Sequence, residues 1–227
     1  MAHTTEDKFQ EFITKIVSLY YHQRQKFFIG IGVIIVIIVA IIISLSGRGK
    51  ENPEVQLRFT EALGIYSVAQ SPDQLDAANE KFIEFTRRFG RHYLSAKAFF
   101  YLGNIAYQNQ DFTKARSFYE KAYSRLKNND VLGPASLFAI GNCYEEQQNY
   151  RKAALIYEQV YHKYKKFPLA ADALLAAGRA YRTLNDLNNA EKIYQLAIKE
   201  LPPGENAEQA KSELAYVLAM KNKIQKF

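Results

Sequence analysis

The side chains that could perform catalysis are scattered along this 227-residue chain. The four histidines are His3, His22, His92 and His162. None of them has a second histidine or a cysteine at the spacing that a zinc site requires. Glu145 and Glu146 are paired carboxylates, but adjacent residues of a helix point in different directions. No phosphate-binding glycine loop and no Gly-x-Ser-x-Gly motif occurs, so we expect no enzyme, no metal and no cofactor.

A second set of side chains is suited to binding a protein partner. These residues lie around three glycines, Gly103, Gly141 and Gly178, at helical spacing, so that they share one face of each helix. The predicted partner-binding groove comprises Phe100, Asn104, Tyr107, Asn142, Glu145, Arg179 and Arg182. Aromatic and arginine side chains dominate binding at many interfaces, and the arginines could make forked contacts with acidic groups. The alternative is a solvated face on which apolar positions such as Phe100 serve packing.

The three glycines mark an internal repeat. They lie 38 and 37 residues apart, and each is followed twelve residues later by alanine and four further on by tyrosine. The residues in register are Gly103, Ala115 and Tyr119; Gly141, Ala153 and Tyr157; and Gly178, Ala190 and Tyr194. A period of this length predicts a solenoid of stacked helical hairpins. We interpret the glycine as the point where the second helix crosses closely, with its alanine at the contact and its tyrosine beside it.

Weaker signals extend the predicted solenoid at both ends. Upstream, a degenerate first repeat with a longer turn is indicated by Leu63, Gly64, Ala78, Phe82 and Phe85. Downstream, residues 206–223 have helical periodicity but no partner helix after them, which predicts a capping helix. The short turns contain residues that can cap the second helices, namely Asp111, Asn149 and Asp186. Because strand-type alternation is absent, we expect an all-α solenoid of three good repeats, one degenerate repeat and a capping helix.

The N-terminal part of the chain has a different pattern. Residues 27–44 carry no charge, and 27–46 could cross a hydrocarbon core of about 30 Å, so we expect one transmembrane helix there. A buried core helix or a cleaved signal peptide is the alternative. Residues 1–26 have an apolar helical face and are expected to lie at the membrane interface or to dock a partner. Residues 47–52 form a linker, and residues 53–227 form the solenoid domain.

Charge and cysteine content narrow the range of partners. The net charge is +7, but basic and acidic residues interleave along the predicted helices, so nucleic acid is not an expected partner. Lysines and arginines flank the apolar run almost equally, so charge alone does not decide the membrane topology.

Cys143 is the single cysteine, and we expect it to be a buried packing residue. Ala40 and Ser44 form a small-residue pair that could support a homo-oligomer, with lipid contact as the alternative.

The repeat resembles the tetratricopeptide repeat over about residues 54–224. The resemblance is carried by the Leu-Gly pair, an aromatic residue three positions later, the Ala–aromatic–Ala triplet and a terminal proline at Pro202. It implies a right-handed solenoid whose first helices line a concave groove for protein partners. Some members of the family clamp a partner's C-terminal carboxylate, and Asn104 matches one clamp position. The clamp is not expected here, because four further positions depart from its pattern: Phe100, Ala139, Asp172 and Ala176.

The order of a short tail, one apolar run and a set of repeats is similar to that of YfgM-like ancillary subunits of the SecYEG translocon. This resemblance implies a single-pass protein of the bacterial inner membrane, with a cytoplasmic N-terminus and a periplasmic solenoid. It also implies an adaptor in protein export or envelope assembly that binds an export channel, chaperones or secreted clients, besides the lipid bilayer. The alternatives are a constitutive structural subunit of a larger membrane complex and a coordinator of outer-membrane or cell-division machinery.

Overall fold

The computed structural model describes residues 10–11, 14, 36–38 and 52–224, and the chain divides into two compact units, Met1–Pro53 and Glu54–Phe227. The expected interfacial segment, transmembrane helix and linker, residues 1–26, 27–46 and 47–52, fall almost entirely outside the described residues. Among the helices that are described, none has both the length and the apolar character needed to cross a membrane.

The expected fold is therefore corrected: the described residues form an all-α solenoid, and no transmembrane helix is found among them. The physical reason lies in the described helices themselves. α4 (Pro72–Arg88) has 17 residues and ends in two arginines. α11 (Glu205–Ile224) is the longest at 20 residues, but glutamates and lysines interrupt it throughout. Each helix buries one face and presents the other to water, which is the pattern of a helix in a water-exposed stack.

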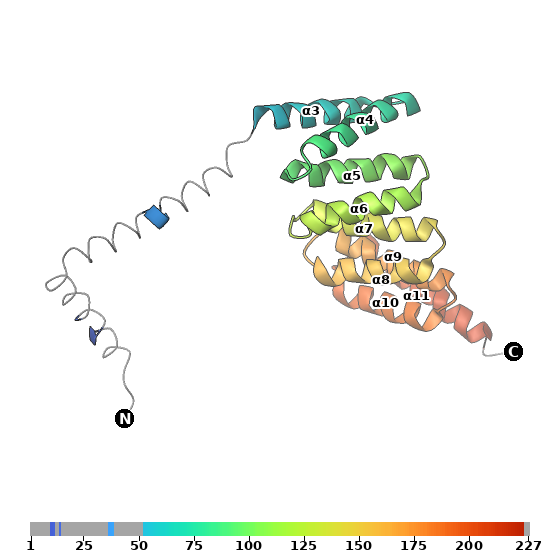
Figure 1. The fold of residues 1–227 in the computed structure, drawn as a ribbon. Coiled ribbons are helices and arrows are strands. Elements are labelled where there is room, and N and C mark those ends of the chain that lie inside the picture. The colour runs from blue at the N-terminus through green and yellow to red at the C-terminus, as the bar shows by residue number, and fades with distance from the viewer. Residues whose placement is uncertain (1–9, 12–13, 15–35, 39–51, 225–227) are drawn as a thin grey trace. The chain divides into compact units, whose positions relative to one another are not determined.

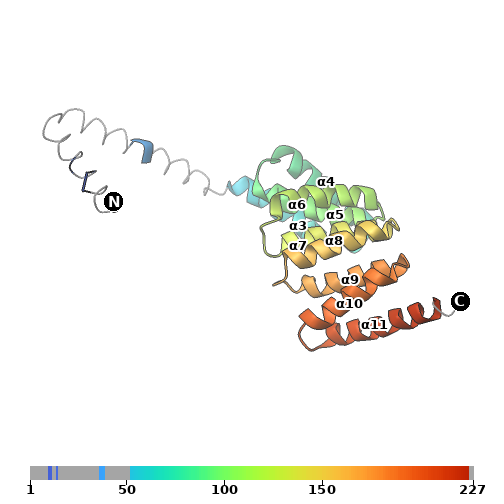
Figure 2. The ribbon, with the colours of Figure 1, turned by 90° about the horizontal axis from the view of Figure 1, so that it is seen from below.

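Between residues 52 and 224 the chain forms four helical hairpins followed by one last helix (Figure 1). The helices are α3 (Pro53–Val68) and α4, α5 (Tyr93–Gln108) and α6 (Phe112–Leu126), α7 (Leu132–Glu146) and α8 (Tyr150–Lys163), α9 (Leu169–Thr183) and α10 (Leu187–Glu200), and α11. The hairpins follow one another along the stack, and α11 lies beside α10 at its end (Figure 2). We call α3, α5, α7 and α9 the first helices and α4, α6, α8 and α10 the second helices.

Short turns with the same chemistry close the last three hairpins. The residue before each cap has a positive φ, of 60° at Gln110, 58° at Gln148 and 60° at Asn185. The next residue then accepts a hydrogen bond at its side chain from a backbone N–H in the first turn of the second helix. The three acceptors are Asp111, Asn149 and Asp186, which confirms the expected caps.

The contact inside each hairpin is between glycine and tyrosine. A Cβ added to Gly103 would lie 2.6 Å from ring atoms of Tyr119, and one added to Gly141 would lie 2.5 Å from a ring atom of Tyr157. Gly178 has the same relation to Tyr194, at 2.5 Å. The interpretation that glycine makes room for the alanine of the second helix needs correction, because the three nearest atoms in every case belong to the tyrosine ring. Those alanines are nevertheless fully buried: Ala115, Ala153 and Ala190.

The first hairpin packs in a different way. Gly64 was expected to hold the glycine position of the degenerate repeat, but it is exposed and a Cβ added there would meet nothing within 4 Å. The aromatic residue of α4, Phe82, instead lies among rings, with its centroid 6.1 Å from that of Phe59 and 5.4 Å from that of Tyr101. Ala62 is the fully buried small residue of α3. The Leu63-Gly64 register is therefore wrong, because an aromatic cluster replaces the glycine–tyrosine contact.

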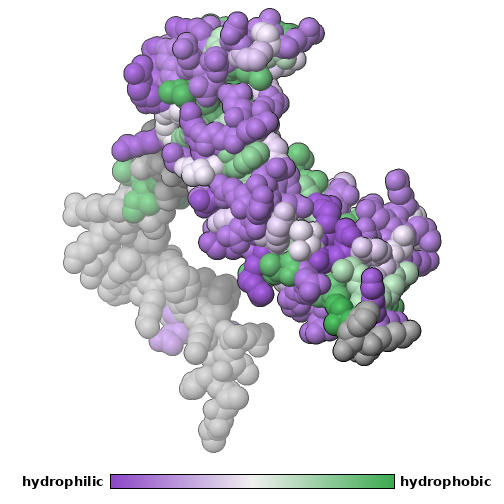
Figure 3. Space-filling model, turned by 90° about the vertical axis from the view of Figure 1, so that its right-hand side faces the viewer, coloured by the Kyte–Doolittle hydropathy of each residue, from purple (hydrophilic) through white to green (hydrophobic). Residues whose placement is uncertain are grey.

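The buried residues form three clusters: one around α3, α4 and α5, a small one of Ala96, Ala122 and Leu126, and a larger one that extends from α5 to α11. Cys143 is fully buried, as expected, and burial raises the pKa of its thiol to about 12. The surface seen in Figure 3 is mostly hydrophilic, and hydrophobic residues form small separate groups on it. Partner binding on this side would therefore rely mainly on polar and charged groups.

Two matched substitutions test the glycine contact. Gly141→Ala should lower the free energy of unfolding by about 1–3 kcal/mol, because the new methyl group overlaps the buried ring of Tyr157. Gly64→Ala should raise it by up to about 1 kcal/mol, because alanine favours the helix and the space there is open. Urea denaturation of the two variants measures both changes. Equal effects of the two substitutions would contradict the assigned contact.

Candidate protein-binding face

The residues predicted to bind a partner come from one side of α5, α7 and α9. We call this surface the first-helix face and define it by Asn104, Tyr107, Asn142, Glu145, Arg179 and Arg182. The two residues on each helix stand three positions apart, so they occupy neighbouring turns of the same face. Arg179 is exposed and the others are half-buried. Phe100 is also half-buried, but its ring lies 5.8 Å from that of Tyr119 and packs against the core, in line with the packing alternative.

The asparagine that follows the glycine holds the hydroxyl of the buried tyrosine. Tyr119 donates to Asn104 Oδ1 at 2.8 Å, and Tyr157 donates to Asn142 Oδ1 at 2.7 Å. Asn104 also donates through Nδ2 to the Tyr66 hydroxyl at 3.4 Å. Burial raises the pKa of both phenols above the ordinary value, so they stay protonated and act as donors. The glycine contact thus fixes the orientation of an amide on the first-helix face.

The third repeat breaks this pattern. Arg179 stands at the position after Gly178, where the earlier repeats have asparagine. Its guanidinium turns to the neighbouring repeat and forms a forked ion pair with Glu145, at 3.0 Å from Nε and 3.2 Å from Nη2. The buried hydroxyl of Tyr194 is left without a hydrogen-bond partner in the described part of the chain. Burial raises the pKa of Tyr194 to about 12.

Glu145 is the centre of the network on this face. Besides the fork from Arg179, its Oε2 accepts a hydrogen bond of 2.7 Å from the Tyr157 hydroxyl. Burial raises the pKa of the Glu145 carboxyl, but the hydrogen bonds from Arg179 and Tyr157 lower it by more, so its pKa lies below the ordinary value. The carboxylate therefore joins helix α7 to both α8 and α9 and stays ionised at neutral pH.

The remaining charged side chains of the face are also engaged within the chain. Arg182 lies 3.3 Å from Glu213 on α11, and its guanidinium stands over the ring of Tyr216 at 5.3 Å. The Tyr107 hydroxyl donates to Glu146 at 3.0 Å. An acidic group of a partner would therefore share the arginines with Glu145 and Glu213. Sequence reasoning missed Glu213 because only the tertiary packing of the capping helix brings it to Arg182.

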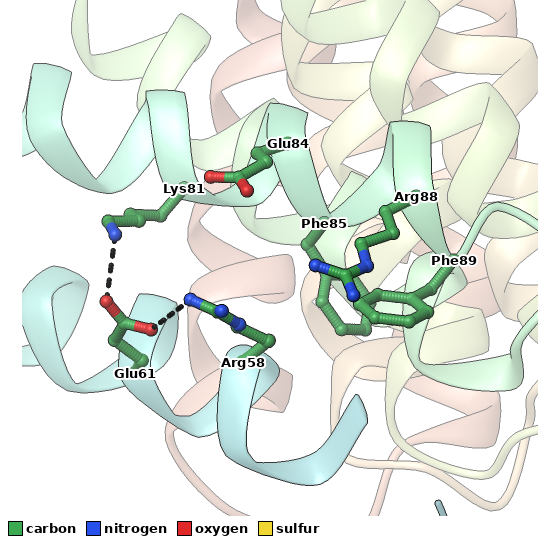
Figure 4. A pocket seen from close by; sticks show the side chains of 7 residues that line it. All are labelled: Arg58, Glu61, Lys81, Glu84, Phe85, Arg88 and Phe89. Carbon is green, nitrogen blue, oxygen red and sulfur yellow. Dashed lines mark hydrogen bonds and ion pairs between the residues drawn. The ribbon is translucent and has the colours of Figure 1, made fainter. Parts of the chain in front are cut away.

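A separate small hollow lies between α3 and α4 (Figure 4). Phe85 and Phe89 line it together with Arg58 and Arg88, and the Arg88 guanidinium stands over the Phe89 ring at 5.3 Å. Glu61 pairs there with Lys81 at 2.8 Å.

The described residues contain no group of three or more His, Cys, Asp or Glu side chains that could hold a metal ion.

Two family models match the repeats of this chain. Residues 94–166 match one family model described as tetratricopeptide repeat, and residues 137–205 match a second with the same description. Together the matches cover α5 to α10, which are the three hairpins with the glycine–tyrosine contact. No curated protein matches the chain. The likeness to YfgM-like translocon subunits is not supported by these findings.

Solved structures show the same fold. A putative kinesin light chain from Podosopora anserina with nearly identical TPR-like repeats is similar at a TM-score of 0.58 and 14% identity, over 78% of this chain and 91% of that one. A signal-transduction ATPase with a tetratricopeptide-repeat sensor from Pyrococcus horikoshii is similar at a TM-score of 0.60 and 19% identity. That match covers 74% of this chain and 28% of the ATPase chain.

Removing one hydroxyl from each of two equivalent tyrosines tests the hydrogen-bond pattern. Tyr157→Phe should lower the free energy of unfolding by about 1–3 kcal/mol, because Asn142 and Glu145 both lose a donor. Tyr194→Phe should change it by less than about 0.5 kcal/mol, because no hydrogen bond is lost. Thermal and urea denaturation of both variants provide the measurement. A larger cost for Tyr194→Phe would show that the hydroxyl has a partner.

The pH dependence of stability tests the role of Glu145. Its pKa is lower in the folded chain than the ordinary value of 4.5, so its ionised form stabilises the fold above that pH. This contribution is lost as the pH falls through the lower folded pKa. Glu145→Gln should therefore be less stable than the wild type at pH 7, by about 1–2 kcal/mol, and should approach it towards pH 3. A stability difference that stays constant from pH 7 to pH 3 would contradict this.

Proposed function

We propose that this tetratricopeptide-repeat protein is a non-catalytic scaffold that binds a segment of a protein partner across its first-helix face. Tetratricopeptide repeats generally bind protein partners, and the matched repeats include the three hairpins that build this face. The family and the fold support the general role. The geometry of the face supports its use as the binding surface.

The observation that carries the proposal is a fixed row of polar groups across α7, α8 and α9. Asn142, Tyr157, Glu145 and Arg179 are joined by hydrogen bonds of 2.7–3.2 Å. Because these side chains are already held in place, a partner that binds them loses less free energy to ordering the surface. Asn142 and Glu145 are half-buried and Arg179 is exposed, so a partner can contact these three without any change in the core.

The face also offers hydrogen-bonding capacity that the fold does not use. Asn142 Oδ1 accepts from Tyr157, and its Nδ2 group has no hydrogen-bond partner among the described residues, so it can donate to a ligand. An amide in this position suits the backbone carbonyl of an extended peptide. The forked Glu145–Arg179 pair lies beside it and can form a charge-assisted hydrogen bond with a charged side chain of the same peptide. We therefore favour a short polar segment of a protein as the ligand.

The identity and location of the partner belong to the proposal as well, and the sequence resemblance alone supports them. On that basis the partners are subunits of a protein-export channel, chaperones or secreted clients at the periplasmic face of the bacterial inner membrane. The rival proposals are a constitutive structural subunit of a larger complex and a coordinator of outer-membrane or cell-division machinery.

Photo-crosslinking in cells tests the binding face. A crosslinking amino acid at Tyr107, on the first-helix face, should capture one or a few discrete proteins identified by mass spectrometry. The same probe at Leu155 provides the control, because Leu155 is 56% exposed but belongs to the second helix α8. Equal capture of the same proteins from both positions would remove the first-helix face from the proposal.

A charge exchange separates binding from stability. In the double variant Glu145→Arg with Arg179→Glu, the ion pair can re-form with reversed polarity, so most of the stability lost in either single variant should return. Recovery of the crosslinked partner should nevertheless fall at least about tenfold, because the partner meets the wrong charge at each position. If a stable double variant recovers the crosslinked partner as well as the wild type does, the partner does not contact this ion pair.

A further inference from the structure

The junctions between consecutive hairpins all lie on one side of the stack. Residues 89–92 join α4 to α5, residues 127–131 join α6 to α7, and residues 164–168 join α8 to α9. With the last residues of the preceding helix included, the three junction segments are 87–92, 123–131 and 161–168. Because each first helix starts where the preceding second helix ends, these junctions lie together on the left of the solenoid in Figure 1. We call them the junction edge. The turns inside the hairpins lie on the opposite edge.

The junction edge is strongly basic. Its cations are Arg87, Arg88, Arg91, Arg125, Lys127, Lys163, Lys165 and Lys166. Asp130 is the acidic residue within the same three ranges. Counted between the helices alone, the junctions contain four cations, Arg91, Lys127, Lys165 and Lys166. The turns on the opposite edge, residues 69–71, 109–111, 147–149 and 184–186, contain Asp111 and Asp186 but no lysine or arginine. In the sequence two of these segments are local basic runs, at 87–92 and 161–166. The fold gathers segments about 37 positions apart onto one side.

Some of these cations have structural roles. Arg88 pairs with Glu54 at 2.6 Å, and Arg125 donates to the Gly90 carbonyl at 2.6 Å. Lys163 donates to the Tyr123 hydroxyl at 2.8 Å, and Lys165 pairs with Glu200 at 3.6 Å. These contacts tie neighbouring helices together and account for the presence of a charge at those positions.

Four other cations have no such role. Within the described residues, exposed side chains that form no ion pair and no hydrogen bond belong to Arg87, Arg91, Lys127 and Lys166. They come from all three junctions, so the uncompensated charge extends along the whole edge and not over one loop. A row of this kind produces a positive potential that attracts an extended anionic surface.

The aromatic residues of the edge limit which anion fits. The Arg88 guanidinium stands 5.3 Å over the Phe89 ring, and Lys165 stands 5.0 Å over the Tyr161 ring. Lys163 lies over both Tyr123 and Tyr164, at 5.0 Å and 5.6 Å. Single-stranded nucleic acids bind by stacking bases on free aromatic faces. Because cations cover these faces, charge attraction is the interaction that remains available.

We propose that the junction edge binds the anionic headgroup surface of a phospholipid bilayer. Cations from three successive hairpins lie along one side, where a plane of negative headgroups can meet them together. A protein surface at a membrane–water boundary typically has aromatic side chains beside lysine and arginine, and the junction edge has tyrosine and phenylalanine in such positions.

The chain enters the solenoid at the same edge. α3 begins there at Pro53. The first-helix face is a separate surface from the junction edge, so a bound bilayer would leave it accessible to a protein partner.

An environment-sensitive fluorophore on the full-length chain tests this proposal. The dye is attached in one variant at Asn128→Cys, on the junction edge, and in another at Asn188→Cys, near the opposite turns; both asparagines are exposed. The native Cys143 is fully buried and does not interfere with labelling. Vesicles containing phosphatidylglycerol should shift the emission of the dye at position 128 to the blue and protect it from an aqueous quencher. Pure phosphatidylcholine vesicles should not, and the dye at position 188 should not respond to either.

Charge reversal provides the second readout. Each lysine or arginine at an anionic surface strengthens binding about fivefold, so Arg91→Glu, Lys127→Glu and Lys166→Glu together should weaken the response of the dye at position 128 at least about 100-fold. The matched control reverses three exposed cations elsewhere, Lys114→Glu, Arg151→Glu and Lys192→Glu, and should keep most of the response.

Three outcomes would overturn the proposal. The first is an equal response of both dye positions to anionic vesicles, and the second is an equal loss of response in the two triple variants. The third is a response of the dye at position 128 to duplex or single-stranded DNA at a lower phosphate concentration than to vesicles, which would assign the edge to nucleic acid. None of these outcomes depends on the protein partner of the first-helix face.

Discussion

The contact between a glycine of the first helix and a tyrosine ring of the second determines most of the structure from α5 to α10. At Gly103, Gly141 and Gly178 a methyl group would overlap the ring, so only glycine permits the observed distance between the helices. The same contact fixes where the phenol points. In two of the three repeats the hydroxyl then holds an asparagine on the first-helix face, at 2.8 Å and 2.7 Å. Core packing and the polar surface therefore have one common origin.

The sequence predicted these three hairpins well because their signal is local and periodic. Glycine, alanine and tyrosine return at constant spacing, and the cap residues Asp111, Asn149 and Asp186 act within their own turn. The first hairpin was predicted less well. Gly64 follows a leucine as in the repeat pattern, but whether a glycine faces a ring or solvent depends on the rotation of α3, which spacing alone does not specify. The expected transmembrane helix has no counterpart among the described helices.

The candidate binding face could be predicted in outline but not in its chemistry. Helical spacing placed Asn142, Glu145 and Arg179 on one side of their helices. It could not show that Arg179 reaches Glu145 of the neighbouring repeat or that Glu213 of α11 meets Arg182, because both pairs join residues more than thirty positions apart. The third repeat shows the consequence. Exchanging asparagine for arginine after the glycine leaves Tyr194 without an acceptor and creates the ion pair that joins α7 to α9.

A double-mutant cycle between positions 141 and 157 is the most direct test of the central claim that glycine makes room for the tyrosine ring. The free energy of unfolding would be measured for the wild type, Gly141→Ala, Tyr157→Leu and the double variant. We expect the alanine to cost at least about 1 kcal/mol less when leucine replaces the ring, because the overlap is then relieved. Additive effects of the two substitutions would contradict the claim, since the methyl group and the ring would then act independently.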